Sequence, residues 1–189
     1  NGEGNAETLK NFCESKGIEL TVVPAQESEG EVVSSTLIRK LIADGNVKKA
    51  NELLCSRFGF SSVIEHGKRL GRELGTPTIN QPLCNELVVP KFGVYASIVT
   101  LEGGDTYCGV TNIGIKPTVG GNTPLCETWM PQYKGGEIYG QRADIRLLEF
   151  IRSERKFSGI DELKNAIIDN SKTALKIYEQ TKETESRQN

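Results

Sequence analysis

The sequence predicts a mainly β protein: an antiparallel barrel preceded by a helix-rich segment and followed by one long helix. After residue 57 the spacing of apolar residues falls from about 3.6 to 2, the period of a strand. From the same point the chain is rich in glycine and β-branched residues, and several short strands joined by Gly and Pro turns are typical of a closed barrel. The helical period returns at Ile160, Leu163 and Ile167. These changes place a boundary near residue 56.

Composition narrows the class of protein. The chain has 189 residues, 37% hydrophobic and 25% charged, as in a globular protein with a core. Its net charge of −2 argues against a nucleic-acid-binding surface. No apolar run approaches the roughly 20 residues of a membrane span, and no signal peptide is recognised. We expect a cytoplasmic monomer that binds small molecules, and neither nucleic acid nor membrane.

The cysteines do not suggest a metal centre. Five are scattered along the chain without a C-x-x-C pair, whereas zinc ligation requires closer spacing. Free thiols in a reducing compartment are the expected state.

The helix-rich segment contains several predicted elements. Residues 5–16 form a helix that Gly17 stops, and a short strand at 20–23 ends before Pro24. A polar loop follows at 26–31. Ser34, Ser35 and Thr36 offer N-caps for a helix closed by Gly45, and a second helix covers about 47–55.

The barrel segment contains five strands predicted from the alternation of apolar residues. They cover residues 58–66, 93–101, 105–113, 125–130 and 142–150. Gly103 and Gly104 indicate a tight hairpin between the second and third of these strands. The final helix is expected to extend from about residue 160 to 180, with a frayed polar tail at 181–189.

The segment 71–80 has the residues that a phosphate-and-metal site needs. Gly71 and Gly75 allow the backbone to approach a ligand, and Pro77 stiffens the segment. Thr78 and Asn80 supply a hydroxyl and an amide oxygen, which are hard ligands suited to Mg²⁺. The alternative is a Gly/Pro turn entering a strand.

A second candidate site precedes the barrel. Ser34, Ser35 and Thr36 at a helix start, with Arg39 one turn on, could bind an anion through hydroxyls, backbone N–H groups and the guanidinium. The alternative is an ordinary N-cap beside a surface arginine.

Two further segments could take part in catalysis. Glu127 shares a strand face with Leu125 and Trp129, and a carboxylate among apolar neighbours suits a general base. The alternative is an outward-facing glutamate. The glycine-rich stretch 109–121 could be a flap over phosphates, or simply a strand followed by a loop. As charge alone, the run 150–157 is a solvated face.

These segments together resemble the bacterial bifunctional riboflavin kinase/FAD synthetases, and in particular their C-terminal riboflavin kinase module. The matching segments, in chain order, are S-S-T-x-I-R at 34–39, A-N-E-L-L at 50–54, G-R-x-x-G-x-P-T-x-N at 71–80, G-V-Y-A at 93–96, N-I-G at 112–114 with P-T at 117–118, E-T at 127–128, I-Y-G at 138–140 and R-x-E-x-K-F at 152–157. Their common order, rather than any single motif, carries the resemblance.

The resemblance implies a six-stranded antiparallel Greek-key barrel with a long C-terminal helix. It implies transfer of the ATP γ-phosphoryl group to the ribityl 5′-hydroxyl of riboflavin, giving FMN, with Mg²⁺ accompanying ATP. The roles it implies are Mg²⁺ ligands at Thr78 and Asn80, a nucleotide loop with Gly71, Arg72, Gly75, Pro77 and Thr78, a flavin contact at Arg152, and a base at Glu127 that also contacts the flavin substrate.

The resemblance also implies a division of the chain. Residues 1–56 would be the C-terminal remnant of an α/β nucleotidyltransferase domain, the FMN adenylyltransferase, with Ser34, Ser35, Thr36 and Arg39 from its phosphate site; 57–180 would be the riboflavin kinase domain. The family's N-terminal histidine motif has no counterpart, because His66 is the only histidine. Adenylylation of FMN is therefore not expected from these residues.

The sequence departs from the family pattern at several positions. Thr76 and Ile79 replace a phenylalanine and an alanine, and Trp129 replaces a histidine. Neither of the first two removes a proposed ligand, so we expect altered packing around the nucleotide. A barrel that binds flavin or nucleotide without turnover remains an alternative. A nucleic-acid-binding barrel is a third, but aromatic residues make up only 6% of the chain.

Overall fold

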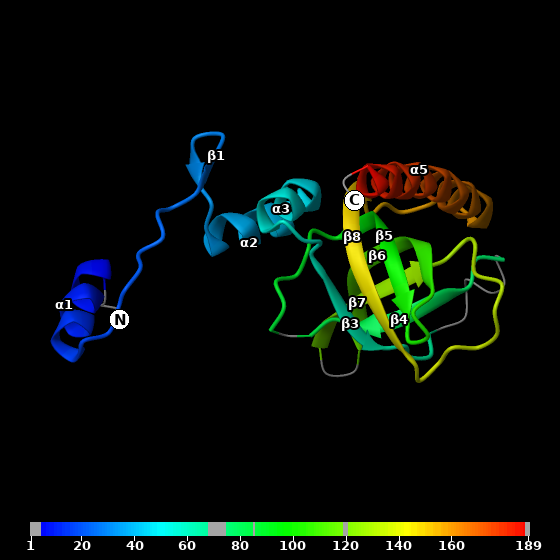
Figure 1. The fold of residues 1–189 in the computed structure, drawn as a ribbon. Coiled ribbons are helices and arrows are strands. Elements are labelled where there is room, and N and C mark those ends of the chain that lie inside the picture. The colour runs from blue at the N-terminus through cyan, green and yellow to red at the C-terminus, as the bar shows by residue number, and fades with distance from the viewer. Residues whose placement is uncertain (1–4, 68–74, 85, 119–120, 188–189) are drawn as a thin grey trace. The chain divides into compact units, whose positions relative to one another are not determined.

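The structure is a computed structural model that describes residues 5–67, 75–84, 86–118 and 121–187 (Figure 1). The chain divides into two compact units, Asn1–Ser34 and Ser35–Asn189. The boundary predicted near residue 56 falls inside the second unit.

The first unit contains one helix and one small hairpin. Helix α1 (Ala6–Lys16) begins where the Thr8 N–H donates to the Asn5 side chain at 2.8 Å, and it ends at Gly17 with φ 67°. Strands β1 (Glu27–Ser28) and β2 (Glu31–Val32) pair in the region predicted as a loop. They can do so because Glu29 and Gly30 have φ of 54° and 82°, as a tight hairpin turn requires.

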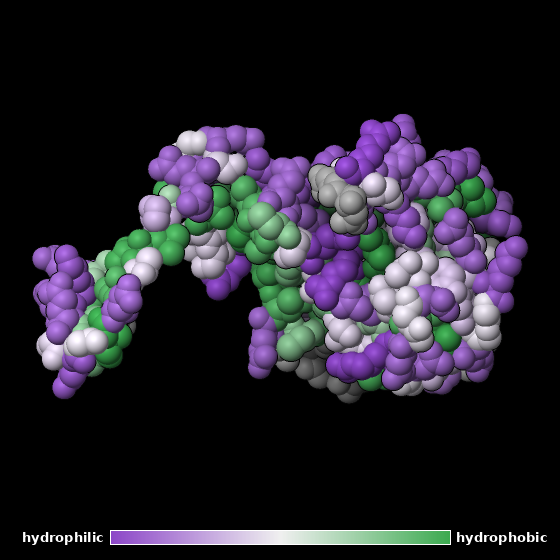
Figure 2. Space-filling view, in the orientation of Figure 1, coloured by the Kyte–Doolittle hydropathy of each residue, from purple (hydrophilic) through white to green (hydrophobic). Residues whose placement is uncertain are grey.

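The strand predicted at residues 20–23 is wrong, because this segment is irregular in the structure. It pairs with no described residue, and a lone strand leaves its backbone groups without partners. Figure 2 shows green, hydrophobic surface on the first unit, and the large apolar side chains exposed in this unit are Leu9, Phe12, Ile18, Leu20, Val22, Val23 and Val32.

The second unit begins with two short helices that are connected to the barrel by hydrogen bonds. Helices α2 (Ser35–Ala43) and α3 (Val47–Leu54) pack through Ile38, Ile42 and Ala50. Asn51 on α3 donates its amide to the carbonyl of Leu147 at 2.8 Å and accepts from the N–H of Phe58 at 2.7 Å. One side chain therefore connects α3 to two segments of the barrel.

The barrel is a six-stranded antiparallel sheet with the order β3-β8-β5-β6-β7-β4. Its strands are β3 (Gly59–Val63), β4 (Thr78–Pro82), β5 (Gly93–Leu101), β6 (Thr106–Thr118), β7 (Gly121–Trp129) and β8 (Arg142–Ser153). The two edge strands approach each other, since the Glu65 N–H donates to the Asn80 carbonyl at 2.8 Å and the Gln81 amide donates to the Ser62 carbonyl at 2.8 Å. This nearly closed barrel confirms the predicted fold class.

Several elements differ in length or existence from the expectation. Strand β4 is not among the five strands predicted from alternation. Its sequence, T-I-N-Q-P, has one large apolar residue, Ile79, so it shows no alternation of apolar and polar residues. Strands β6 and β7 continue as one long hairpin through most of the stretch considered as a flap or loop. Helix α5 (Ile160–Ser186) extends past residue 180, so residues 181–186 are helical rather than frayed.

Side chains alternate between two apolar layers. Tyr95, Ile113 and Cys126 belong to the barrel interior. Val94, Ala96 and Val110 face the other way and pack with Ala174 and Tyr178 of α5, which lies along the outside of the barrel (Figure 1). The strand face beneath α5 is therefore the outer face, and the register assigns every other strand residue to one of these two faces.

Candidate functional site

A row of polar residues crosses the outer face of the barrel. Asn80 on β4 lies directly opposite Glu127 on β7, and Glu127 lies directly opposite Asn112 on β6. The row continues through Val94 on β5 to Arg152 on β8. Directly opposite residues of antiparallel strands share a face, with Cβ atoms about 4.5–5.5 Å apart. Because Val94 packs beneath α5, the whole row belongs to the outer face.

Asn80 is the most buried polar member of this row. Its side chain is 4% exposed, and Oδ1 has no hydrogen-bond partner among the described residues. The backbone of Gly67 covers this amide, since a Cβ at residue 67 would overlap Nδ2 of Asn80 and lie 2.8 Å from Oδ1. Leaving a buried acceptor unpaired costs about 1–3 kcal/mol, so this oxygen is suited to a ligand.

Thr78 and Asn80 have the chemistry that Mg²⁺ prefers. Residues two apart on a strand share a face, so the half-buried Thr78 is on the same side as the Asn80 amide. A hydroxyl and an amide oxygen are hard, neutral ligands, and the unpaired Oδ1 fits such a cation. The described residues contain no group of three His, Cys, Asp or Glu side chains that could hold a metal.

Glu127 is half-buried and shares its face with Leu125 and Trp129, as strand alternation predicts. The next residue, Thr128, faces the barrel interior. Its hydroxyl is 2.9 Å from that of Thr111, which is 2.7 Å from the hydroxyl of Ser97. This buried chain of hydroxyls joins the two strands that carry Glu127 and Asn112.

Arg152 is held at the other end of the row by helix α5. Its Nε donates to Oδ1 of the buried Asn170 at 3.2 Å, and its guanidinium lies 5.5 Å from the centre of the Phe157 ring. Partial burial, followed by repulsion from Arg155, lowers the pKa of Arg152, while the negative charge of Glu154 opposes this change. These contacts fix the direction of a cationic side chain on the outer face.

The remaining predicted site residues have different positions. Gly71 and Arg72 lie outside the described residues. Gly75 has φ 74°, a left-handed conformation that favours glycine, and Pro77 directly precedes β4. Ser34 ends the first unit, whereas Ser35, Thr36 and Arg39 are exposed on α2 of the second.

Asn112 was not singled out from the sequence. It stands in the Asn-Ile-Gly motif at 112–114, but its place beside Glu127 depends on the pairing of β6 with β7. His66, the only histidine in the sequence, lies three residues after β3, with its ring centroid 3.8 Å from that of Tyr139, consistent with a structural role.

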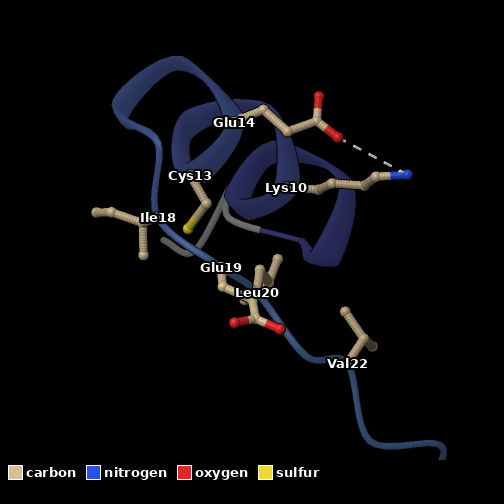
Figure 3. Close-up of a pocket in the computed structure, with 7 residues that line it drawn as sticks. All are labelled: Lys10, Cys13, Glu14, Ile18, Glu19, Leu20 and Val22. Atoms are coloured by element: carbon tan, nitrogen blue, oxygen red, sulfur yellow. Dashed lines mark ion pairs between the residues drawn. The ribbon is translucent and has the colours of Figure 1, made fainter.

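A separate pocket of about 480 Å³ lies in the first unit (Figure 3). It is lined by residues of α1 and of the segment that follows: Lys10, Cys13, Glu14, Ile18, Glu19, Leu20 and Val22. Lys10 and Glu14 form an exposed ion pair at 4.0 Å. None of the predicted site residues that the structure describes lines this pocket.

Within the described part of the chain, no helix combines the length and apolar character needed to cross a membrane.

Comparison with known proteins identifies the family. Residues 54–178 match the family model for riboflavin kinase (flavokinase). The chain is 33% identical over 163 residues to the bifunctional riboflavin kinase/FMN adenylyltransferase of Listeria monocytogenes, covering 86% of this chain and 51% of that protein. It is 35% identical over 180 residues to the protein of the same name from Escherichia coli K12, covering 95% and 57%.

A solved structure shares the fold. The crystal structure of a macrolide-efflux protein from Streptococcus pneumoniae superposes with a TM-score of 0.81 and 31% identity, covering 91% of this chain and 55% of that one. The chain spans about half the length of the curated relatives it matches. The chain belongs to the riboflavin kinase family, whose family model matches residues 54–178.

Proposed function

We propose that this chain transfers the γ-phosphoryl group of ATP to the 5′-hydroxyl of riboflavin, giving FMN and ADP. The observation that supports this proposal best is the pairing of Asn80 with Glu127 on the outer face of the barrel. A metal-ligand candidate and a carboxylate then stand side by side, which is what phosphoryl transfer to an alcohol requires.

Glu127 is the proposed general base. An alcohol is a weak nucleophile, so a carboxylate within hydrogen-bond reach accepts the hydroxyl proton as the oxygen attacks phosphorus. The new bond joins the ribityl oxygen to the γ-phosphorus, and the bond from that phosphorus to the β,γ-bridging oxygen breaks. The electron pair leaves with ADP, and the proton remains on Glu127 until it is lost to solvent.

Thr78 and Asn80 are the proposed ligands of Mg²⁺, on the strength of the unpaired Asn80 oxygen. They would hold Mg²⁺, which would supply positive charge to offset the negative charge of the phosphate groups. Gly71, Arg72, Gly75 and Pro77 belong to the proposed nucleotide loop, which leads into Thr78. Arg152, held by Asn170, is the proposed contact with the flavin.

The decisive experiment supplies riboflavin, Mg²⁺ and ATP labelled at the γ-phosphate, and separates the flavins. Label in FMN would support the kinase. Riboflavin binding without any FMN would favour the alternative, a flavin-binding barrel without turnover.

We further propose that residues 1–56 correspond to the C-terminal part of an FMN adenylyltransferase domain and that 57–180 are the kinase domain. The similarity to the bifunctional relatives supports this, because a match covering 95% of the chain extends before residue 54, where the kinase family model begins. These residues are proposed to make FMN without adenylylating it, as a cytoplasmic monomer, and a longer parent chain is proposed to carry the FMN adenylyltransferase activity as well. FAD formed from FMN and ATP would contradict that proposal.

A further inference from the structure

A glutamate from the end of β8 lies against a glycine of β6, beside the polar row. A Cβ built on Gly114 would overlap Oε1 of Glu154 and lie 3.2 Å from its Cδ. The same point is 3.6 Å from Nδ2 of Asn112. The carboxylate of Glu154 therefore occupies the space above Gly114, and the amide of Asn112 borders it, on the outer face of the barrel.

The absence of a side chain at residue 114 creates this arrangement. Gly114 is two residues after Asn112 on β6, so any side chain there would project from the same face and displace the Glu154 carboxylate. Gly114 itself is buried, whereas Asn112 is half-buried and Glu154 is exposed. The charge of Glu154 acts on Arg152, but no hydrogen bond within the described part of the chain engages the Asn112 amide or the Glu154 carboxylate, so both can bind a ligand.

The chemistry of the pair is complementary to a sugar alcohol. The amide Nδ2 donates, the carboxylate only accepts, and each hydroxyl of a polyol can do both. The pair also has the right position, because Asn112 lies directly opposite Glu127. If the terminal hydroxyl of a substrate reaches Glu127, its neighbouring hydroxyls lie within one strand spacing, over β6.

We propose that Asn112 and Glu154 form a polyol subsite that binds the secondary hydroxyls of the ribityl chain, and that Gly114 leaves the room in which the Glu154 carboxylate lies beside Asn112. The proposal rests on the proposed function, since it assigns riboflavin to the outer face. It makes Asn112 and Glu154 specificity residues: they distinguish a hydroxylated side chain from an alkyl one of the same length. Sites built to hydrogen-bond a hydroxyl reject analogues that lack it, because their own polar groups are then left unpaired.

The test compares binding of two flavins to the whole chain by titration of flavin fluorescence. One is riboflavin, and the other carries a 5-hydroxypentyl side chain in place of ribityl, so that only the secondary hydroxyls differ. The wild-type protein is expected to bind riboflavin more tightly. Asn112→Ala and Glu154→Gln should each reduce that preference about tenfold, with unchanged affinity for the hydroxypentyl flavin.

Gly114→Ala should reduce the preference in the same way, because it displaces the carboxylate without removing it. Glu149→Gln is the matched control; it removes a carboxylate of β8 that pairs with Lys48 at 3.1 Å, and it should leave the preference unchanged. Equal losses of affinity for both flavins, or an unchanged preference in the Asn112 and Glu154 variants, would overturn the subsite. The test measures flavin binding and gives a result whether or not FMN forms. A failure of the subsite proposal can therefore be told apart from a failure of the kinase proposal.

Discussion

Asn80 and Glu127 lie directly opposite each other on β4 and β7, and the same pairing aligns Glu127 with Asn112 on β6. Residues far apart in the sequence thus become neighbours through backbone pairing alone. The site needs no long loop to bring its metal-ligand candidate next to the proposed base, Glu127. Its geometry should therefore depend on the register of these three strands.

Replacing Asn80 by alanine should weaken metal use. Asn80→Ala removes the buried oxygen that has no partner among the described residues, so more Mg²⁺ should be needed for half-maximal FMN formation. Mutation of residues that only hydrogen-bond to metal ligands already costs 10–100-fold in metal affinity or activity, so removing a ligand should lower the affinity for Mg²⁺ about 100-fold. The measurement is the initial rate against Mg²⁺ concentration. Gln132→Ala, which truncates an exposed amide, should leave that curve unchanged.

Helices α2 and α3 should stabilise the barrel. Asn51→Ala removes the hydrogen bonds to the Leu147 carbonyl and from the Phe58 N–H, and should lower the free energy of unfolding by about 1–3 kcal/mol. Urea unfolding measures this change. Asn46→Ala is the control, because Asn46 precedes the same helix without a side-chain capping bond. Equal effects of the two changes would contradict the bridging role of Asn51.

The hydroxyl chain inside the barrel should be a structural unit. Thr111→Val leaves the buried hydroxyls of Ser97 and Thr128 without their central partner. The expected loss is about 1–3 kcal/mol in the free energy of unfolding. Thr106→Val, at an exposed position of the same strand, should change it by less than about 0.5 kcal/mol. A neutral Thr111→Val would show that the hydroxyls are satisfied in another way.

Thiol reactivity should depend on folding and pH. Burial raises the pKa of Cys108 and of Cys126 from 9.0 to about 12, whereas Cys55 and Cys84 are exposed. Thiolates are the reactive form, so at pH 8 a thiol reagent should label Cys55 and Cys84 but spare Cys108 and Cys126 until the protein unfolds. Mass spectrometry of the labelled peptides checks this.

The same pKa changes have a consequence for stability. A raised pKa in the folded state means that the folded protein retains protons that the unfolded chain loses. The contribution of the protonated Cys126 thiol to the free energy of unfolding is therefore complete below pH 9, and it is lost as the pH rises from 9 towards 12. The free energy of unfolding should therefore fall less steeply over this range in Cys126→Ala than in the wild type. Identical slopes would contradict the assigned pKa.

The sequence predicts those parts of the fold in which apolar spacing is unambiguous. Helix α3, strand β5 and helix α5 follow from it, because each presents a regular apolar face. Strand β4 does not, because its inward residues are Ile79 and the polar Gln81, whose amide bonds to carbonyls of Ser62 and Ala143. That burial becomes favourable only once the barrel brings those carbonyls together.

Individual candidate residues of the site can be proposed from the sequence, but their neighbours in space cannot. Thr78, Asn80 and Glu127 stand out by residue type and by family resemblance. The neighbours of Glu127 depend on strand register, which no local pattern specifies, so Asn112 was missed. The role proposed for Glu154 depends on the space that Gly114 leaves, and only the assembled barrel shows that the Glu154 carboxylate fills this space.

The rate of FMN formation by Glu127→Gln tests the central claim most directly. The substitution keeps the size of the side chain and removes its ability to accept the proton, so kcat should fall by about 10²–10⁴-fold while the affinity for riboflavin changes little. Glu102→Gln is the control and should retain full activity, because the Glu102 carboxylate accepts from the Arg142 N–H at the opposite end of the barrel strands. A kcat for Glu127→Gln equal to that of the wild type would contradict the assignment of Glu127 as the base.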